Sequence, residues 1–121
     1  MHETIVQTQG QTSRILIGRH GDDLTALLPT QRAAIVTDDN VYRLYGRGFP
    51  DLPILRMGSG EGIKILESVS ELARKLMDLD ADRSWFILGI GGGIVCDVAG
   101  FLASIYMRGV RFGFVPTTLL A

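Results

Sequence analysis

A chain of 121 residues, with 12 basic and 13 acidic side chains and a net charge of −1, has room for one domain with its own core and little room for two. The balanced charge excludes the strongly basic surface that nucleic acid or an acidic membrane requires, so we expect neither as a partner. The chain has no run of 18 apolar residues, no signal peptide and a single cysteine, which together predict a cytoplasmic protein without an internal disulfide.

Two short strands and a short helix are expected at the start of the chain. Residues 4–8 and 13–18 are rich in apolar and β-branched side chains around a polar turn, which is typical of a β-hairpin. Leu24, Leu27 and Leu28 then follow with helical spacing. The helix should end near Pro29, because a proline ring interrupts helical hydrogen bonding.

Strands and helices alternate through the rest of the chain. The expected strands cover residues 33–37, 52–57, 85–88 and 111–115, and the expected helices cover residues 41–45, 65–77 and about 94–107. Pro53 has no backbone N–H to donate to a neighbouring strand. We therefore expect its strand to lie at a sheet edge, or Pro53 to stand at the start of the strand. The last helix has an apolar stripe of the kind that faces a core, formed by Val98, Phe101, Leu102 and Ile105. This alternation predicts an α/β fold in which helices flank a mainly parallel sheet.

A glycine-rich turn joins the strand 85–88 to the helix after it. Gly91, Gly92 and Gly93 remove every Cβ from this turn, so backbone N–H groups can approach a ligand closely. The positive end of the helix dipole favours an anion such as a phosphate at the same place. The spacing departs from the usual G-x-G-x-x-G fingerprint, because Ile94 stands at the third glycine position. The turn predicts a phosphate or dinucleotide cradle, with tight strand-to-helix packing as the alternative explanation.

Polar residues follow two other strands, at the carboxyl ends where such folds bind ligands. Asp38, Asp39 and Asn40 suit ribose hydroxyls and equally suit the cap of the next helix. Glu61 and Lys64 follow a glycine turn at the start of a helix, where Lys64 can meet a phosphate or a ribose. A solvated charge pair explains these two residues as well.

Four more residues near the glycine turn and the last strand have two explanations each. Asp97 is expected in the first helical turn, where a carboxylate either interacts with the dipole alone or also accepts hydrogen bonds from a ligand hydroxyl. Thr117 and Thr118 either offer hydroxyls at a strand end or form an ordinary loop. Arg108 suits either the helix C-terminus or an anionic group of a substrate.

The sequence predicts no metal centre and no redox thiol. Cys96 is expected to be a small packing residue, because no histidine or second cysteine lies near it in the sequence. His2 and His20 lie in a tail and a loop without metal-ligand spacing, so the residues present do not assemble a metal site.

Five segments together resemble the 3-dehydroquinate synthase family. They read TDDNV at 37–41, GEGIK at 60–64, GGGIVCDVAGF at 91–101, YMRGV at 106–110 and VPTTLLA at 115–121. They occur in the family's order and extend over nearly the whole chain, which makes them far more specific together than singly. One departure is Cys96, where the family usually has glycine.

The resemblance implies both a fold and an activity. The fold would be the N-terminal half of a dehydroquinate synthase-like fold, with a Rossmann-like NAD-binding domain over residues 1–121. The activity would be that of a sugar-phosphate cyclase, a phosphate-eliminating lyase that converts 3-deoxy-D-arabino-heptulosonate 7-phosphate into 3-dehydroquinate. That reaction belongs to the shikimate pathway of chorismate and aromatic amino acid biosynthesis. In the family, bound NAD transiently oxidises a substrate hydroxyl, phosphate leaves, the carbonyl is reduced again, and an intramolecular aldol step recloses the ring.

The resemblance also implies a role for each loop. The adenosine-side contacts correspond to Asp38, Asp39 and Asn40, and a second cofactor loop corresponds to residues Glu61–Lys64. The pyrophosphate turn corresponds to Gly92, Gly93 and Ile94. A nicotinamide-side contact corresponds to Asp97, and a further cofactor contact corresponds to Thr117 with Thr118. Arg108 matches a substrate-binding arginine that reaches into the partner subunit's site, which implies a homodimer of the full-length protein. The acidic pair at the ribose loop would disfavour a 2′-phosphate, so NAD is expected rather than NADP.

The family's metal ligands, a glutamate and two histidines, lie in a helical C-terminal half that would follow Ala121. The divalent metal, zinc or cobalt, is therefore expected only with that half, and no catalytic residue is assigned within residues 1–121. The isolated chain is expected to be inactive. Three alternatives remain: a sister cyclase such as 2-deoxy-scyllo-inosose synthase, a relative of the iron-containing alcohol and glycerol dehydrogenases, and a stand-alone nucleotide-binding module without chemistry.

Overall fold

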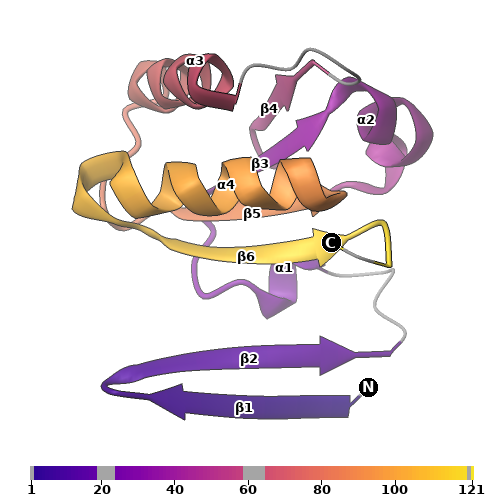
Figure 1. The fold of residues 1–121 in the computed structure, drawn as a ribbon, viewed down its shortest axis with the longest axis vertical. Helices are drawn as coiled ribbons and strands as arrows, with labels where there is room; N and C mark the ends of the chain where they lie inside the picture. Colours follow the sequence, from indigo (N-terminus) through magenta and orange to yellow (C-terminus); the bar gives the residue numbers. More distant parts are fainter. Residues whose placement is uncertain (1, 19–23, 59–64, 120) are drawn as a thin grey trace.

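The computed structural model describes residues 2–18, 24–58, 65–119 and 121, and it contains two separate sheets (Figure 1). The predicted hairpin is one of them: β1 (His2–Thr8) and β2 (Gln11–Ile17) pair antiparallel, and each begins two residues earlier than expected. An ion pair crosses the hairpin between Arg14 Nε and Glu3 Oε1 at 2.6 Å. Every residue of the two strands except Leu16 is exposed, so the hairpin lies outside the main core.

The second sheet has four parallel strands in the order β4-β3-β5-β6. They are β3 (Ala33–Asp38), β4 (Ile54–Met57), β5 (Phe86–Gly91) and β6 (Arg111–Pro116). All six residues of β5 are buried, as are the first five of β3, because these two central strands are covered on both faces. The prediction for Pro53 is confirmed, since β4 is an edge strand that begins immediately after it.

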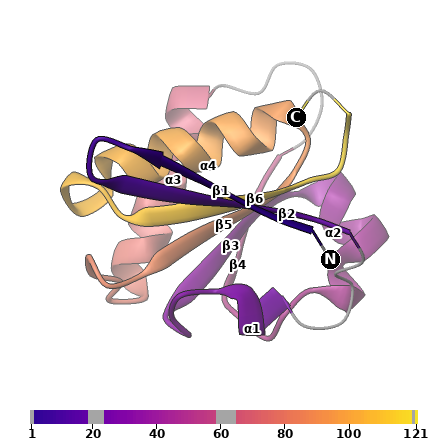
Figure 2. The ribbon, with the colours of Figure 1, turned by 90° about the horizontal axis from the view of Figure 1, so that it is seen from below.

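Helices cover both faces of the parallel sheet, which confirms the predicted α/β architecture (Figure 2). One face packs against α3 (Ile65–Asp78) and α4 (Gly93–Ile105). The opposite face packs against α1 (Leu24–Leu27) and α2 (Asp39–Tyr45). A 3₁₀ turn that was not predicted, η1 (Gly46–Gly48), follows α2. None of the helices within the described ranges has the length and apolar character needed to span a bilayer.

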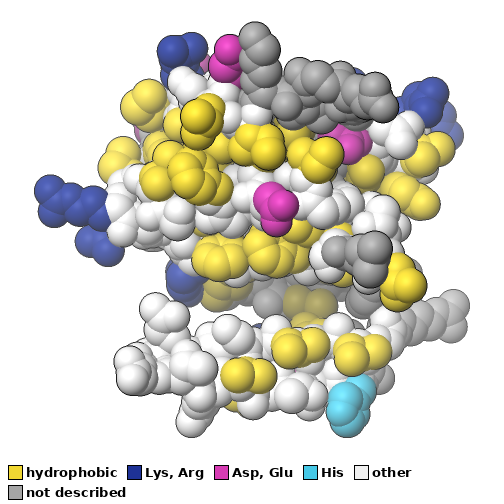
Figure 3. Space-filling model, viewed as in Figure 1, with side chains coloured by type: hydrophobic (Ala, Val, Ile, Leu, Met, Phe, Trp, Pro, Cys, Tyr) yellow, Lys and Arg dark blue, Asp and Glu magenta, His cyan; other side chains and the backbone are white. Residues whose placement is uncertain are grey.

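The apolar stripe predicted for α4 is half wrong. Val98 and Leu102 are fully buried, but Phe101 and Ile105 are 45% and 52% exposed. Hydrophobic side chains accordingly gather on the face of the molecule over α4 (Figure 3). The helix is apolar on nearly every side, so periodicity alone could not select the buried face. Close approach to the sheet favours small side chains on the buried face of α4. A Cβ on Gly89 of β5 would lie only 2.8 Å from the Cβ of Ala99, which shows how closely helix and strand approach.

The helix α4 is also shifted relative to its prediction. It begins at Gly93 and ends at Ile105, and a 3₁₀ turn, η2 (Tyr106–Arg108), follows it. Met107 and Arg108 have positive φ angles of 48° and 65°, so the chain turns sharply here before it enters β6.

In α3, Val69, Leu72 and Leu76 are buried as expected. The other apolar residues at its ends are exposed, namely Ile65, Leu66 and Met77.

Candidate functional site

The candidate site lies at the edge of the parallel sheet where the strands end. The chain runs from β3 outward to β4, and then returns to the other side of β3 to form β5. The strand order therefore reverses between β3 and β5, and open α/β sheets bind ligands in the crevice outside such a reversal. The helices that follow these two strands, α2 and α4, begin on opposite faces of the sheet. This arrangement brings the loop at Asp38 beside the glycine turn.

The glycines of the turn have two different functions. A Cβ on Gly91 would lie 2.6 Å from the Cβ of Val95, so this glycine is required by packing of the strand end against α4. A Cβ on Gly93, by contrast, would meet no described atom within 4 Å. Gly92 has an extended conformation and is the N-cap of α4, without any side-chain cap. The packing explanation thus holds for Gly91, while no atom of the described residues fills the space in front of Gly93.

The two threonines after β6 lie against the same turn. The backbone N–H of Thr117 donates to the carbonyl of Gly91 at 2.9 Å. A Cβ built on Gly92 would lie 3.3 Å from the methyl group of Thr118. Both threonine side chains are exposed. The structure therefore places Thr117 and Thr118 next to the predicted pyrophosphate turn, on the side of β6.

Sequence reasoning missed Thr37 as part of this site. Its side chain is fully buried, and its hydroxyl donates to the carbonyl of Ile90 at 2.8 Å, which ties the ends of β3 and β5 together at the strand reversal. A threonine at the end of an otherwise apolar strand was the only signal for this contact. The partner carbonyl is 53 residues away, so local patterns could not identify it.

Asp97 does not lie in the first turn of α4, which is a correction to the prediction. The helix begins one residue earlier than expected, so its first turn contains no acidic residue and the exposed Asp97 falls in the second turn. The dipole effect fades within the first turn, so capping no longer explains this carboxylate. Asp97 and the half-exposed Ile94 both present their side chains to solvent beyond the glycine turn.

Cys96 is a packing residue, as predicted. Its thiol is buried and donates to the carbonyl of Gly91 at 3.8 Å, which is a weak sulfur hydrogen bond. Burial raises the pKa of the Cys96 thiol, and the neighbouring carboxylate of Asp97 raises it further. A thiol with a raised pKa is a poor nucleophile at neutral pH.

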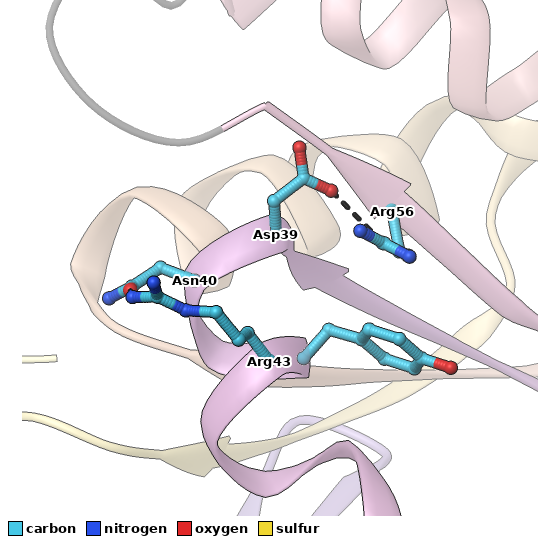
Figure 4. Close-up of a pocket in the computed structure, with 5 residues that line it drawn as sticks. Asp39, Asn40, Arg43 and Arg56 are labelled. Carbon is cyan, nitrogen blue, oxygen red and sulfur yellow. Dashed lines mark hydrogen bonds and ion pairs between the residues drawn. The ribbon is translucent and has the colours of Figure 1, made fainter.

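The polar residues at the end of β3 have two different roles, because one caps the next helix and the other two line a surface hollow. Asp38 is the N-cap of α2, because its Oδ1 accepts a hydrogen bond from the N–H of Val41 at 2.7 Å. Asp39 and Asn40 instead line an open hollow of about 570 Å³ with Tyr42, Arg43 and Arg56 (Figure 4). The capping explanation thus holds for Asp38, and Asp39 and Asn40 are available to a ligand.

The polar side chains of this hollow hold one another in place (Figure 4). Arg56 Nε donates to Asp39 Oδ1 at 2.9 Å, and Arg43 Nη2 donates to Asn40 Oδ1 at 2.6 Å. The guanidinium of Arg56 also lies over the ring of Tyr42, 4.3 Å from its centroid. Neither Arg56 nor Tyr42 was expected from the sequence, because Arg56 meets Asp39 and Tyr42 only after β4 pairs with β3.

Three of the predicted site residues are not seen at this site: one lies elsewhere in the fold, and two lie outside the described residues. Arg108 is exposed in η2, at the far end of α4 from the glycine turn and at the edge of the sheet where the strands begin. It therefore does not join the other residues within this chain. Glu61 and Lys64 lie outside the described residues. Among the described residues, no group of three metal-ligating side chains is close enough together to hold an ion.

Comparison with known families identifies one family model that matches the chain. The model of the 3-dehydroquinate synthase N-terminal family matches residues 54–121. The 3-dehydroquinate synthase of Koribacter versatilis is 38% identical over 136 aligned positions, which cover 100% of this chain and 37% of that protein. The 3-dehydroquinate synthase of Enterococcus faecalis is 41% identical, and the alignment covers 84% of this chain and 30% of that protein. The chain thus spans about a third of the length of the curated relatives it matches.

Solved structures of related enzymes have the same fold. A 2-deoxy-scyllo-inosose synthase in complex with carbaglucose-6-phosphate, NAD⁺ and Co²⁺ superposes with a TM-score of 0.77 at 25% identity, over 96% of this chain and 35% of that one. A 2-epi-5-epi-valiolone synthase from Streptomyces hygroscopicus with NAD⁺ and Zn²⁺ bound gives a TM-score of 0.68 at 26% identity, over 94% of this chain and 35% of that one. The Rossmann-like fold expected from the sequence is therefore confirmed.

Proposed function

We propose that this chain, which belongs to the 3-dehydroquinate synthase family of sugar-phosphate cyclases, is the NAD-binding part of a 3-dehydroquinate synthase. NAD and a divalent metal are cofactors within the family, as the NAD⁺-bound and Co²⁺- or Zn²⁺-bound relatives demonstrate. For this chain, binding of NAD is the proposal. The full reaction is a proposal too, because the chain covers only 37% of the first of its curated relatives.

The observation that carries the proposal is the free space in front of Gly93. A Cβ at this position meets no described atom within 4 Å, although Gly91, two residues earlier, is tightly packed. The space lies at the N-terminus of a helix of 13 residues, at the strand reversal and beside Thr118. Backbone N–H groups and the helix dipole at such a place favour the two negative charges of a pyrophosphate. The residues present therefore fit a dinucleotide.

The other residues of the site would hold the rest of the cofactor. The pyrophosphate would be surrounded by Gly92, Gly93 and Ile94, with Thr117 and Thr118 beside them. The adenosine would bind at Asp39 and Asn40, while Asp38 caps α2. The nicotinamide side of the cofactor would lie at Asp97. Glu61 and Lys64 would form the second cofactor loop. When bound, NAD would supply the reversible oxidation of a substrate hydroxyl, and the protein's own contribution would be to orient the cofactor and exclude water.

The substrate side of the reaction would need groups beyond those described. We assign the conversion of 3-deoxy-D-arabino-heptulosonate 7-phosphate into 3-dehydroquinate, with loss of phosphate, to the complete protein together with a zinc or cobalt ion. Arg108 would bind the substrate of a partner subunit in a homodimer, which accounts for its place at the opposite edge of the sheet. We expect residues 1–121 alone to bind NAD without turnover.

A sister cyclase is the second candidate, because a 2-deoxy-scyllo-inosose synthase shares the fold over 96% of this chain. The 38% sequence identity to a 3-dehydroquinate synthase over the whole of this chain favours the first candidate. Turnover assays of the complete protein with the two sugar phosphates would separate the two candidates.

A substitution at Gly93 tests the cofactor site. We expect Gly93→Val to weaken NAD binding by at least about tenfold, since a β-branched side chain would fill the space that the pyrophosphate needs. Isothermal titration calorimetry would measure the affinity, and a urea titration would show that the fold is retained. Gly48→Val is the matched control, because a Cβ at Gly48 also meets no described atom within 4 Å. Equal NAD affinity of the Gly93 variant and the wild type would contradict the proposal.

A further inference from the structure

Arg56 occupies a place that the proposed cofactor contacts do not explain. It is the third residue of the edge strand β4 and pairs in register with Thr37 of β3. Its side chain crosses to α2, where Nε donates to Asp39 and the guanidinium lies 4.3 Å from the centre of the Tyr42 ring. Lys75 of α3 donates to the backbone carbonyl of Arg56 at 3.3 Å. Two side chains of α2 thus define where this guanidinium lies, and Lys75 holds the backbone of the strand that carries it.

Stability of the fold does not account for this arrangement. The side chains of Arg56 and Asp39 are 47% and 53% exposed, and ion pairs this exposed contribute little to folding. Their effect is on geometry: the ion pair fixes one edge of the guanidinium, and the Tyr42 ring supports one of its faces. The result is a planar cation held at the wall of the hollow at the strand ends.

A planar guanidinium in this setting suits a purine base. Nucleobases stack on aromatic rings and on arginine guanidinium planes, and the contact depends on the plane rather than on charge alone. Asp39 and Asn40 stand beside Arg56 in the same hollow and carry the acceptor oxygens that ribose hydroxyls require. The hollow follows β3, the direct neighbour of β5 and its glycine turn, so base, ribose and pyrophosphate would occupy successive strand ends.

We propose that Arg56, supported by Tyr42 and held by Asp39, is the platform on which the adenine of the dinucleotide stacks. The inference rests on the proposed function and deepens it, because it assigns the base-binding residue of the same site. Arg56 touches the cofactor far from the reacting atoms, so it sets affinity for the adenosine end and takes no part in the chemistry. A different explanation, in which Arg56 attracts the cofactor phosphates by charge alone, makes a different prediction for Arg56→Lys.

Two substitutions and one matched control test this inference, with ADP-ribose as the calorimetric probe. Arg56→Gln removes both charge and guanidinium, and Arg56→Lys keeps the charge but loses the plane. We expect both variants to bind ADP-ribose about tenfold more weakly than the wild type, in line with the loss of one base-stacking contact. Arg14→Gln is the control, because Arg14 also forms an exposed ion pair, with Glu3 at 2.6 Å, but lies on the separate hairpin.

The outcomes distinguish the two proposals. Full ADP-ribose affinity in Arg56→Lys would overturn the platform in favour of simple charge attraction, and full affinity in Arg56→Gln would overturn any role of Arg56. In both cases the wild type and both variants would still bind, so the cofactor site itself would stand. No binding of ADP-ribose or NAD to the wild-type protein would instead refute the proposed function. Circular dichroism of each variant would verify the fold, which an exposed position should not perturb.

Discussion

At the scale of single residues, hydrogen bonds decide which of two chemically similar side chains is available to a ligand. Asp38 and Asp39 are adjacent carboxylates at the end of β3, yet Asp38 accepts the hydrogen bond that caps α2 and Asp39 lines the hollow. Because Asp39 is ion-paired with Arg56, the acidic pair carries less free negative charge than its sequence indicates. The expected preference for NAD over NADP therefore involves a carboxylate that already has a cationic partner.

Tyr106 is a residue-scale prediction for stability. Its buried hydroxyl donates to the carbonyl of Ala81 at 2.7 Å, which links the end of α4 to the segment before β5. Tyr106→Phe would leave this buried carbonyl without its partner, so we expect the free energy of unfolding at pH 7 to fall by about 1 kcal/mol. Urea denaturation followed by circular dichroism would measure the change.

The same residue makes a pH-dependent contribution. Burial raises the pKa of Tyr106 above its usual value of 10.0, and the nearby Asp82 and Asp80 raise it further. The folded state therefore holds this proton more tightly than the unfolded state. Its contribution is fully present below about pH 10 and is lost as the pH rises through the folded pKa. The wild type should thus lose stability above pH 10 more steeply than Tyr106→Phe, and parallel pH profiles would contradict this account.

At the scale of elements, the sheet decides which face of an apolar helix is buried. Both α3 and α4 carry more apolar residues than one face can bury, and those left over are exposed. The buried residues of α4, several of which are small, are Val95, Cys96, Val98, Ala99, Leu102 and Ala103. Small side chains there allow close approach to Gly89, which a periodic pattern does not reveal.

Two adjacent residues of α4 test this assignment. Leu102 is fully buried, so we expect Leu102→Ala to lower the free energy of unfolding by about 3 kcal/mol through lost packing and a residual cavity. Phe101 is 45% exposed, so Phe101→Ala should cost about 1 kcal/mol or less, although it deletes a larger side chain. Chemical denaturation of the two variants would decide the matter. A larger loss for Phe101 than for Leu102 would show that the helix faces the sheet in another orientation.

At the scale of the whole molecule, the chain is divided into a packed sheet and a separate hairpin. Both core clusters consist of residues from the parallel sheet, its helices and the segments that connect them, and neither contains a residue of β1 or β2. Figure 1 shows the hairpin beyond β6, which is the edge strand on that side. An isolated two-stranded hairpin is marginally stable in water, so the two parts should differ in local stability.

Hydrogen exchange of backbone amides would measure this difference. We expect paired amides of β1 and β2 to exchange on the order of 100-fold faster than those of β3 and β5, because the hairpin can open without disrupting the core. Val36 and Leu88 are suitable internal references, since both are buried in central strands. Equal protection of hairpin and sheet would indicate that they unfold as one cooperative unit.

The sequence by itself determined the order of strands and helices, the parallel sheet, the edge position after Pro53 and the family, because these depend on local patterns and on motifs contiguous in the chain. Only the tertiary structure decided that Gly91 serves packing while Gly93 is open, that Phe101 faces solvent, and that Asp39 is held by Arg56. It also revealed the hydrogen bond from Thr37 to Ile90. Each of these depends on contacts between separate elements, and such contacts exist only after the strands pair and the helices pack against them.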